Sequence, residues 1–177
     1  SKIYHSIMKH INNYHVLITT GGASVGEEDH LINFVKDNGE VFFWKIAIKP
    51  GRPLAVGIVK NTFIICLPGN PVSVHLLYGM LIKPFLELLC SSKMILPKAI
   101  KTKINFSMKK KTNRMEWLRV KIDRNKKFLS VNKFPKQGSG MISSIAYSDG
   151  IIEIPESVKK VKKGDVFNFY LFNEIYN

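Results

Sequence analysis

The sequence predicts an α/β domain followed by a small all-β domain. Two observations lead to this prediction: helices and strands alternate up to about residue 91, and short strands with almost no helical periodicity follow. The composition is compatible with both domains, because the 177 residues are 45% hydrophobic and have a mean hydropathy near zero. A chain of this length and composition folds as one globular domain or as two small domains with real cores.

The opening of the chain reads as a helix, a strand, a helix and a strand. Apolar residues at helical spacing predict a helix over residues 2–12, and a short apolar run predicts a buried strand at Val16–Thr19. A second helix is expected over residues 27–38, where Gly39 is suited to end it, and a second strand over Val41–Ile48. This order predicts a parallel pair of strands joined by a right-handed crossover.

A hairpin and a long helix come next. Pro53–Val59 and Thr62–Leu67 predict two strands of a hairpin that is added to the same sheet. The long apolar helix begins at Pro71, where a missing N–H costs nothing, and Asn70 is placed to cap it. Pro84 is expected to kink this helix one turn before its end.

The remainder of the chain predicts a separate small all-β unit. Basic or glycine-containing turns separate its strands, and one short helical turn is expected near residues 141–146. Strands are expected at residues 99–107, 114–122, 127–134, 150–154 and 165–172.

The formal charge of +14 raises the question of a polyanionic partner. Residues 93–136 hold 15 basic and 2 acidic residues, so most of the surplus lies there. Lysine dominates, whereas nucleic-acid recognition favours arginine. A solvated basic face and a surface that attracts anionic substrates both remain open, and nucleic-acid binding is not expected.

The two cysteines, Cys66 and Cys90, lie in apolar stretches without metal-ligand spacing to any histidine, so both are expected to be buried free thiols. Free thiols suit a reducing cytoplasm. No apolar run approaches the ~20 residues of a membrane helix. The longest run, residues 72–89, is interrupted by His75, Lys83, Pro84 and Glu87.

The first loop suited to chemistry follows the strand at Val16–Thr19 and precedes the next helix. Its glycines let backbone N–H groups approach an oxyanion, and the helix N-terminus adds positive potential. The pattern is neither a GxGxxG motif nor a Walker A loop, so a dinucleotide or an ordinary ATP site is not predicted. A tight structural turn is the alternative. The residues that could contact a ligand are Thr20, Gly21, Gly22, Ser24 and Gly26.

Three acidic residues, Glu27, Glu28 and Asp29, follow this loop. Carboxylates in the first turn of a helix commonly just offset the helix dipole. The alternative is that one of them holds a divalent cation beside bound phosphates, since Mg²⁺ prefers oxygen ligands.

The third feature is a pair of lysines and a stiff loop. Lys45 and Lys49 are an even number of residues apart on an expected strand, so they should share one face. Two prolines flank Gly51-Arg52 and pre-position its cation. Converging cations suit an oxyanion, and an exposed strand end with solvated lysines is the alternative.

The fourth feature is the turn from Leu67 to Pro71, with Ser73 just after it. A helix start explains this turn by itself. Its N-terminus is also a second anion-suited position on the same side of the sheet.

These four segments, in this order and spacing, resemble the family of molybdenum insertases that includes MoeA and the gephyrin E domain. The matching strings are TTGGASVGEED, FWKIAIKPGRPLAVG and LPGNPVS, which cover residues 19–73 almost without interruption. Farther along, RMEWLRV and QGSGMISSIAYSDGIIEIPE are similar to the family's C-terminal β-domain. Each loop alone is generic, whereas the set is specific and spans nearly the whole chain.

The resemblance implies the fold class. Residues 1–91 would form part of a molybdopterin-binding, MogA-like, three-layer α/β domain, and residues 94–177 a small β-barrel domain. Family members begin with two further domains and the opening strands of the α/β domain. Because this chain starts at Ser1 without them, we expect a fragment or a processed product that does not turn over by itself.

The resemblance also implies an activity in molybdenum cofactor biosynthesis. A molybdopterin molybdenumtransferase inserts molybdate into adenylylated molybdopterin and releases AMP, with Mg²⁺ or another divalent cation. Asp29 matches the family's acidic residue for metal and adenylate, and Lys45 and Lys49 match cations near substrate and molybdate, so these three are the expected catalytic residues. The expected substrate-binding residues are Thr20, Gly21, Gly22, Ser24, Gly26, Arg52, Pro68, Gly69, Asn70, Pro71 and Ser73. Those expected at a molybdate seat are Arg114, Arg119 and Ser139.

Two other functions stay open for the sequence. The first is a molybdopterin adenylyltransferase-like enzyme, which shares the glycine loop but lacks SVGEED, KPGRP and the β-domain. The second is a non-enzymatic, gephyrin-like scaffold. The resemblance further implies a cytoplasmic protein that is a homodimer in full length and binds small-molecule substrates. The adenylyltransferase of the same pathway is a candidate partner, whereas nucleic acid and membranes are not expected.

Overall fold

A computed structural model describes residues 2–21, 30–138 and 140–177, and it divides into two compact units. The first unit comprises Ser1–Ile46 and Gly51–Val74. The second comprises Ala47–Pro50 and His75–Asn177. The domain boundary that the family resemblance predicts near residues 91–94 is a different division and stays a prediction.

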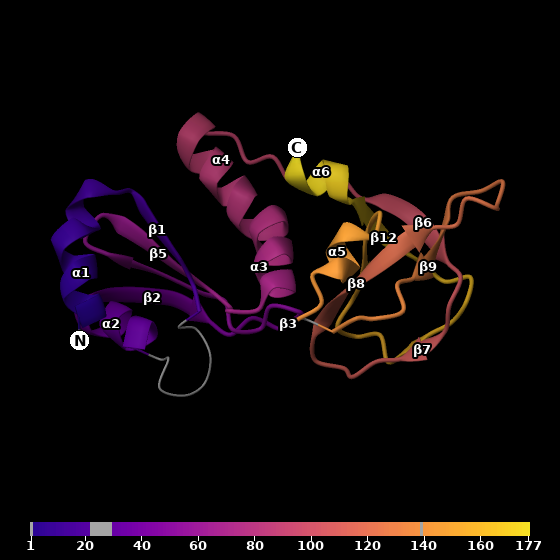
Figure 1. The fold of residues 1–177 in the computed structure, drawn as a ribbon, viewed down its shortest axis with the longest axis horizontal. Coiled ribbons are helices and arrows are strands. Elements are labelled where there is room, and N and C mark those ends of the chain that lie inside the picture. Colours follow the sequence, from indigo (N-terminus) through magenta and orange to yellow (C-terminus); the bar gives the residue numbers. More distant parts are fainter. Residues whose placement is uncertain (1, 22–29, 139) are drawn as a thin grey trace. The chain divides into compact units, whose positions relative to one another are not determined.

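The first unit combines helices with a four-stranded sheet (Figure 1). The predicted helix over residues 2–12 is confirmed, with a 3₁₀ turn at its end, and so is the hairpin. The elements are α1 (Lys2–His10), a 3₁₀ turn (Ile11–Asn13), β1 (Val16–Thr20), α2 (His30–Asn38), β2 (Gly39–Trp44), β4 (Ala55–Val59) and β5 (Thr62–Leu67).

The sheet has the strand order β1-β5-β4-β2. β1 runs parallel to β5, while β4 is antiparallel to both β5 and β2. The predicted adjacent pairing of the first two strands is therefore wrong: β1 and β2 point the same way, but the hairpin lies between them. Because β1, β2 and β5 run in one direction, their carboxyl ends meet at the same edge of the sheet.

Both described helices of this unit share one core with the sheet. Ile11 and Phe34 are buried together with Ala55, Ile64 and Cys66, which alternate along β4 and β5. Period-2 alternation places such strand residues on one face, so the helices cover that face.

Gly39 ends α2 as predicted, although for a different reason. A Cβ at Gly39 would lie 1.9 Å from the Ile58 carbonyl oxygen, so close approach to β4 requires glycine there. The left-handed cap conformation for which glycine was predicted does not occur at Gly39.

A helix of 21 residues, Pro71–Ser91, follows β5. It consists of α3 (Pro71–Leu77), a π-helical turn (Tyr78–Ile82) and α4 (Lys83–Ser91). Pro84 lies at the start of α4 rather than one turn before the helix end, so the predicted kink position is wrong. The π turn explains this, because a wider turn gives the proline ring room that an α turn denies it.

This helix is long and apolar enough, by length and composition alone, to cross a membrane. Its most apolar window has a hydropathy of 1.4, which is higher than the interrupted sequence suggested. Because 44% of that window is buried inside the protein and core helices pass the same test, the observation is weak support for a membrane span.

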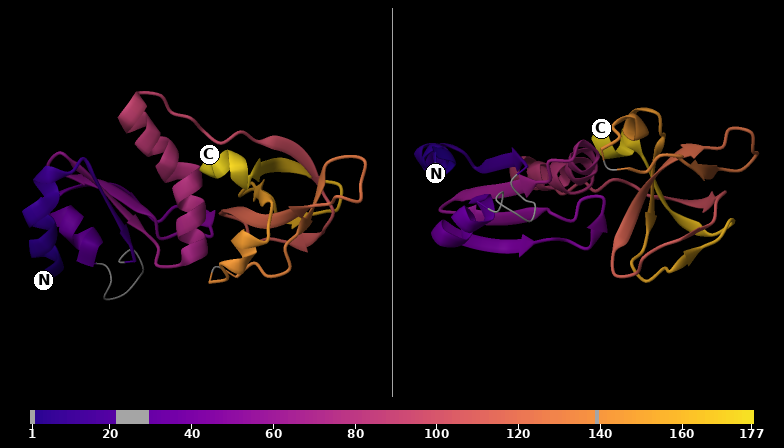
Figure 2. Two further views of the ribbon diagram at one scale, coloured as in Figure 1. Left: turned by 45° about the horizontal axis from the view of Figure 1, so that its top comes forward. Right: turned by 60° about the horizontal axis from the view of Figure 1, so that its bottom comes forward.

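The second unit contains a β-barrel, and five strands that the sequence predicts take part in it. Figure 2 shows these strands curving around a common interior. They are β6 (Ile100–Ile104), β8 (Met115–Ile122), β9 (Ser130–Lys133), β10 (Gly150–Ile154) and β12 (Val166–Leu171). The predicted helical turn is α5 (Ser143–Ala146). Elements that the sequence did not predict are the short strands β3 (Ile48–Lys49), β7 (Met108–Lys109) and β11 (Lys160–Val161), and α6 (Phe172–Tyr176).

The barrel closes because β10 pairs with both β12 and β8. The resulting ring runs β10-β12-β6-β9-β8 and back to β10. Leu118, Val120, Val131, Ile152 and Phe169 fill its interior. The chain is thus a mixed α/β sheet domain followed by a five-stranded β-barrel.

The cysteines differ in exposure. Cys66 is buried on β5, and burial raises the pKa of its thiol. Cys90 is a free and exposed cysteine on α4, so the prediction that both thiols are buried is wrong for Cys90.

The close approach of strands where the barrel closes requires glycine at position 150. A Cβ there would lie 2.1 Å from the Tyr170 carbonyl oxygen and 2.8 Å from Phe169 Cε2. We expect Gly150→Ala to lower the free energy of unfolding by about 1–3 kcal/mol, because the strands must separate to admit the methyl group. Urea denaturation measures the change. Gly140→Ala is the matched control, since nothing lies within 4 Å of a Cβ at Gly140, and equal losses in the two variants would contradict the prediction.

The thiols should react at different rates. At pH 8 we expect iodoacetamide to alkylate Cys90 and to spare Cys66, because a raised pKa leaves less thiolate and burial blocks access. Mass spectrometry of tryptic peptides reads both sites. In urea both should react, and alkylation of Cys66 at the rate of Cys90 in the folded chain would refute the prediction.

Candidate functional site

Two of the predicted loops meet at the carboxyl edge of the first unit's sheet. Thr20 lies opposite Leu67 in the β1–β5 register, and the Gly21 N–H donates a hydrogen bond to the Leu67 carbonyl at 3.0 Å. Gly21 has a φ of 86°, a left-handed conformation that favours glycine. A Cβ on Gly69 would lie 3.7 Å from Gly21 Cα, so the two glycine backbones are close neighbours.

The second of these loops starts a helix as the sequence predicts. Asn70 Oδ1 accepts a hydrogen bond from the Ser73 N–H at 3.4 Å, and Pro71 is the first residue of α3. Gly69 and Pro71 are exposed, whereas Pro68 and Ser73 are buried. The exposed backbone of this turn could therefore contact a ligand, while Ser73 and Pro68 support the turn from beneath.

Lys45 follows β2 at the same edge of the sheet. Three strand spacings separate β2 from β1, which is roughly 14 Å at ~4.8 Å per strand. The Lys45 ammonium lies 3.7 Å from the centroid of the Trp44 ring, a cation–π contact, and Lys36 lies 5.0 Å from the same centroid. The cation of Lys45 is thus held beside the strand end and exposed to solvent.

The prediction that Lys45 and Lys49 share a face of one strand is wrong. β2 ends at Trp44, and Lys45 has a φ of 69°, so the chain turns there. The turn is held by hydrogen bonds from the Lys45 N–H to Leu54 O and from the Ile46 N–H to Arg52 O. Lys49 lies on β3, a separate strand that belongs to the second unit.

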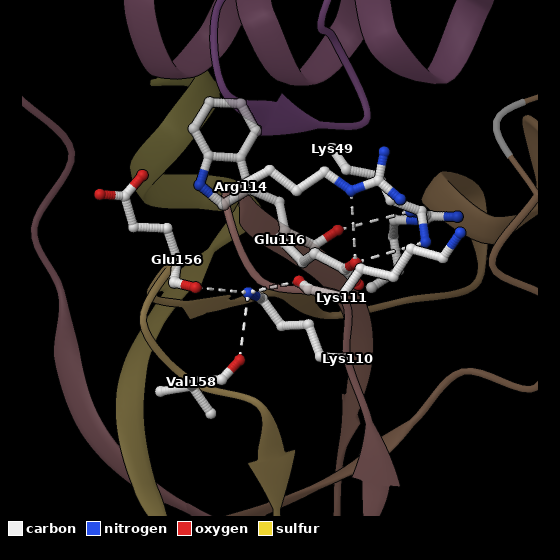
Figure 3. Close-up of polar contacts among 9 residues, drawn as sticks. Lys49, Lys110, Lys111, Arg114, Glu116, Glu156 and Val158 are labelled. Atoms are coloured by element: carbon white, nitrogen blue, oxygen red, sulfur yellow. Dashed lines mark hydrogen bonds and ion pairs between the residues drawn. The ribbon is translucent and has the colours of Figure 1, made fainter.

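In the second unit, Lys49 and Arg114 converge on one buried carboxylate (Figure 3). β3 pairs in parallel with β8 so that Lys49 lies opposite Glu116. Lys49 Nζ is 3.5 Å from Glu116 Oε1, and Arg114 Nε is 3.9 Å from the same atom. The Glu116 side chain is 3% exposed, against 50% for Lys49 and 32% for Arg114. Glu116 therefore anchors two cations that remain accessible to solvent.

A third cation, Lys110, lies nearby and is buried. Figure 3 shows its ammonium between three backbone carbonyls, those of Lys111 at 3.2 Å, Val158 at 3.3 Å and Glu156 at 3.4 Å. Burial lowers the pKa of Lys110, and the charge of Glu116 opposes that shift. Lys49, Arg114 and Lys110 thus lie around a single carboxylate, which leaves a local excess of positive charge. We call these three cations and Glu116 the Glu116 cluster.

Arg119 lies apart from this cluster, on the other face of β8. Its guanidinium is buried and donates to Ser144 Oγ at 3.1 Å, to Gly138 O at 3.3 Å and to Trp117 O at 3.5 Å. Burial lowers the pKa of Arg119 to about 10. All three of its nitrogens donate to protein oxygens and the residue is 1% exposed, so Arg119 holds Ser144 and Gly138 in place rather than presenting an accessible cation.

Five predicted site residues lie outside the described residues: Gly22, Ser24, Gly26, Asp29 and Ser139. Among the residues that the structure describes, no group of three His, Cys, Asp or Glu side chains is arranged to hold a metal ion. Asp29, the predicted metal ligand, is not among them, so its role stays a prediction.

Sequence reasoning missed Glu116 and Lys110. An available signal was the parity of β8, since Arg114 and Glu116 alternate in step with the buried Leu118 and Val120 and so lie on the inward face. A carboxylate in that position requires a cationic partner.

Comparison with known proteins places these features in a family. Residues 1–88 match the profile of the probable molybdopterin binding domain, and residues 101–172 match that of the MoeA C-terminal region, domain IV. The chain belongs to the MoeA family. It is a MoeA-like protein of molybdenum cofactor biosynthesis.

Two curated relatives illustrate the match. A Methanocaldococcus jannaschii protein named for molybdopterin biosynthesis is 31% identical over 170 residues, which are 96% of this chain and 39% of that protein. A molybdopterin molybdenumtransferase of Haemophilus influenzae is 32% identical over 162 residues, 90% of this chain and 40% of the relative. The chain therefore spans about 40% of the length of these relatives.

A solved structure agrees with the fold. The crystal structure of a MoeA protein of molybdopterin biosynthesis from Pyrococcus horikoshii is 28% identical, with a TM-score of 0.74. The match covers 96% of this chain and 40% of that one.

The Glu116 cluster of this MoeA-like chain can be tested through its stability. We expect Glu116→Gln to lower the free energy of unfolding by about 2 kcal/mol, because Lys49 and Arg114 lose the carboxylate that they share and the buried amide does not replace its charge. Urea denaturation measures the loss. Glu156→Gln is the control, because that side chain is exposed, and it should change stability by less than about 0.5 kcal/mol. Indistinguishable variants would show that the cluster contributes nothing to the fold.

Proposed function

We propose that this chain contributes to the insertion of molybdate into adenylylated molybdopterin, with release of AMP. The observation that carries the proposal is the convergence of Lys49 and Arg114 on the buried Glu116, which fixes two accessible cations at one place. Molybdate is a tetrahedral dianion, and two fixed cations complement its charge. Relatives named as molybdopterin molybdenumtransferases support the same assignment.

In this proposal the first unit handles the adenylylated substrate. The exposed backbone at Gly69 offers a neutral N–H donor to phosphate oxygens, while the Gly21 N–H holds the neighbouring loop to Leu67. Asn70 and Pro71 give the turn at Gly69 a fixed geometry. Lys45 and Arg52 supply positive charge at the same sheet edge as the phosphoanhydride loses AMP. We keep Asp29 as the proposed ligand of Mg²⁺ or another divalent cation, which would polarise the phosphoanhydride.

The second unit handles molybdate in this proposal. Lys49 and Arg114 hold the oxyanion while Glu116 limits their mobility, so less side-chain entropy is lost on binding. Of the two arginines expected at this seat, we retain Arg114, because Arg119 is committed to protein oxygens. We retain Ser139 as a proposed donor. The sulfurs that receive molybdenum belong to the substrate, so the proposal needs neither cysteine.

The proposal extends to the protein's surroundings. We propose a cytoplasmic homodimer in full length that works on small-molecule substrates, with the pathway's adenylyltransferase as its partner. Nucleic acid and membranes have no part in it. An adenylyltransferase-like function is less well supported, because the barrel matches the MoeA C-terminal region.

Turnover is tested in a chimera in which this chain replaces the matching 40% of the Haemophilus influenzae relative. We expect molybdate-dependent release of AMP from adenylylated molybdopterin. Asp29→Ala should abolish that release while leaving the circular dichroism spectrum unchanged. Absence of molybdate-dependent AMP release from a folded chimera would refute the proposed function.

Molybdate binding is tested by calorimetry, with the chain alone and with the chimera. We expect Lys49→Ala and Arg114→Ala each to weaken binding about tenfold, the effect of losing one charge-assisted hydrogen bond. Lys103→Ala is the matched control, because Lys103 is an exposed lysine of the same barrel. Equal affinities in all three variants would remove the Glu116 cluster from the proposal.

A further inference from the structure

A groove in the second unit uses none of the residues of the Glu116 cluster. Its walls are the end of β8 with the turn after it, the end of β9 with the residues that follow, and residues 146–149 at and after the end of α5. These elements are labelled in Figure 1. The groove has a volume of about 650 Å³. Small-molecule sites are ~300–1,000 Å³ in volume, so the groove has room for a ligand of that class.

The electrostatics of the groove favour an anion. Three cations line it, Lys121, Arg124 and Lys133, together with two carboxylates. Asp149 is already used by the fold, since its Oδ2 accepts the Ile122 N–H at 2.8 Å and its Oδ1 pairs with Arg124 at 3.3 Å. Within the described part of the chain, Lys121 has no carboxylate within 4.0 Å.

The other carboxylate, Asp123, is occupied as well. Its Oδ2 accepts a hydrogen bond from Asn105 Nδ2 at 3.0 Å, and its Oδ1 accepts the Asn125 N–H at 3.2 Å. Both carboxylates therefore hold loops in place, and neither is free to bind a metal cation. The surplus charge of the groove is positive, which points to an anionic ligand.

Aromatic rings lie beside these charges. Lys121 Nζ is 5.9 Å from the centroid of the Phe134 ring, and Tyr147, which also lines the groove, is 65% exposed. A groove that holds cations and one exposed ring suits a ligand that carries both an anionic group and a planar ring, because the planar ring stacks on Tyr147 while a cation pairs with the anionic group.

A hydroxyl in the same wall lacks a partner. Ser148 Oγ is buried and has no hydrogen-bond partner among the described residues. Buried hydroxyls are nearly always hydrogen-bonded, so an unpaired one in a groove wall is available to a ligand oxygen.

We propose that this groove binds a nucleoside monophosphate, with the phosphate at Lys121 and Ser148 and the base against Tyr147. The phosphate accounts for the surplus charge and the unpaired hydroxyl, and the base accounts for the exposed Tyr147 ring. AMP is one such ligand. The proposal does not rest on the insertion reaction, because the groove shares no residue with the sites assigned to that reaction.

The test is a titration of the ¹⁵N-labelled 177-residue chain with AMP, followed by amide chemical shifts. We expect saturable shifts at Ile122 and at residues 147–149. Lys121→Ala and Tyr147→Ala should each weaken binding about tenfold, because one removes a charge-assisted contact and the other a stacking surface. Lys101→Ala, an exposed lysine on β6, should leave the affinity unchanged.

Separate titrations with inorganic phosphate and with adenosine divide the ligand into its parts. Each should bind at least about tenfold more weakly than AMP, since each makes only one of the two kinds of contact. Inorganic phosphate that binds as tightly as AMP would overturn the nucleotide assignment. Shifts confined to other residues, or wild-type affinity in Lys121→Ala, would overturn the site itself. Molybdate calorimetry and AMP release report on the insertion reaction separately, so either proposal can fail alone.

Discussion

The parallel pairing of β3 with β8 is the interaction on which the cationic cluster depends. The chain leaves the first sheet at Trp44 and turns at Lys45, and hydrogen bonds to Leu54 and Arg52 close that turn. The residues in between can therefore join the barrel, where two register pairs fix Lys49 opposite Glu116. A lysine on a free loop would lose more conformational entropy on binding an anion than one already held at a strand.

The barrel retains positive charge by satisfying its buried cations with neutral oxygens. Lys110 donates to three carbonyls, and Arg119 donates to two carbonyls and a hydroxyl. Hydrogen bonds to neutral acceptors reduce the penalty of burying a charge without cancelling the charge. Glu116 differs from these acceptors because it is charged, and both Lys49 and Arg114 pair with it. The consequence is a local surplus of positive charge around the single carboxylate of Glu116, which favours an anionic ligand.

The sequence predicted elements whose signals are local. The hairpin, the Asn70 cap and the barrel strands follow from turn residues and periodicity, and the structure contains all of them. The prediction of a strand through Lys45 was wrong because Lys45 has a left-handed φ, which lysine does not favour. Hydrogen bonds to Leu54 and Arg52, at the other end of the connection to β4, hold that conformation. The hairpin's place between β1 and β2 is likewise a long-range choice, which strand patterns do not encode.

In the candidate site too, the sequence could predict local features but not long-range side-chain contacts. Gly21 and Gly69 could be brought together from the sequence because both follow strands that run in the same direction. Glu116 could not be matched with Lys49, because 67 positions separate them and their contact requires the β3–β8 pairing.

The two units also offer anions different chemistry. The sheet edge of the first unit presents neutral backbone donors, which select by direction and do not repel one another, whereas the barrel presents charges, which act over longer distances and are screened by salt. A ligand that carries a phosphate therefore gains orientation from the first kind of site, and a compact dianion gains most of its affinity from the second.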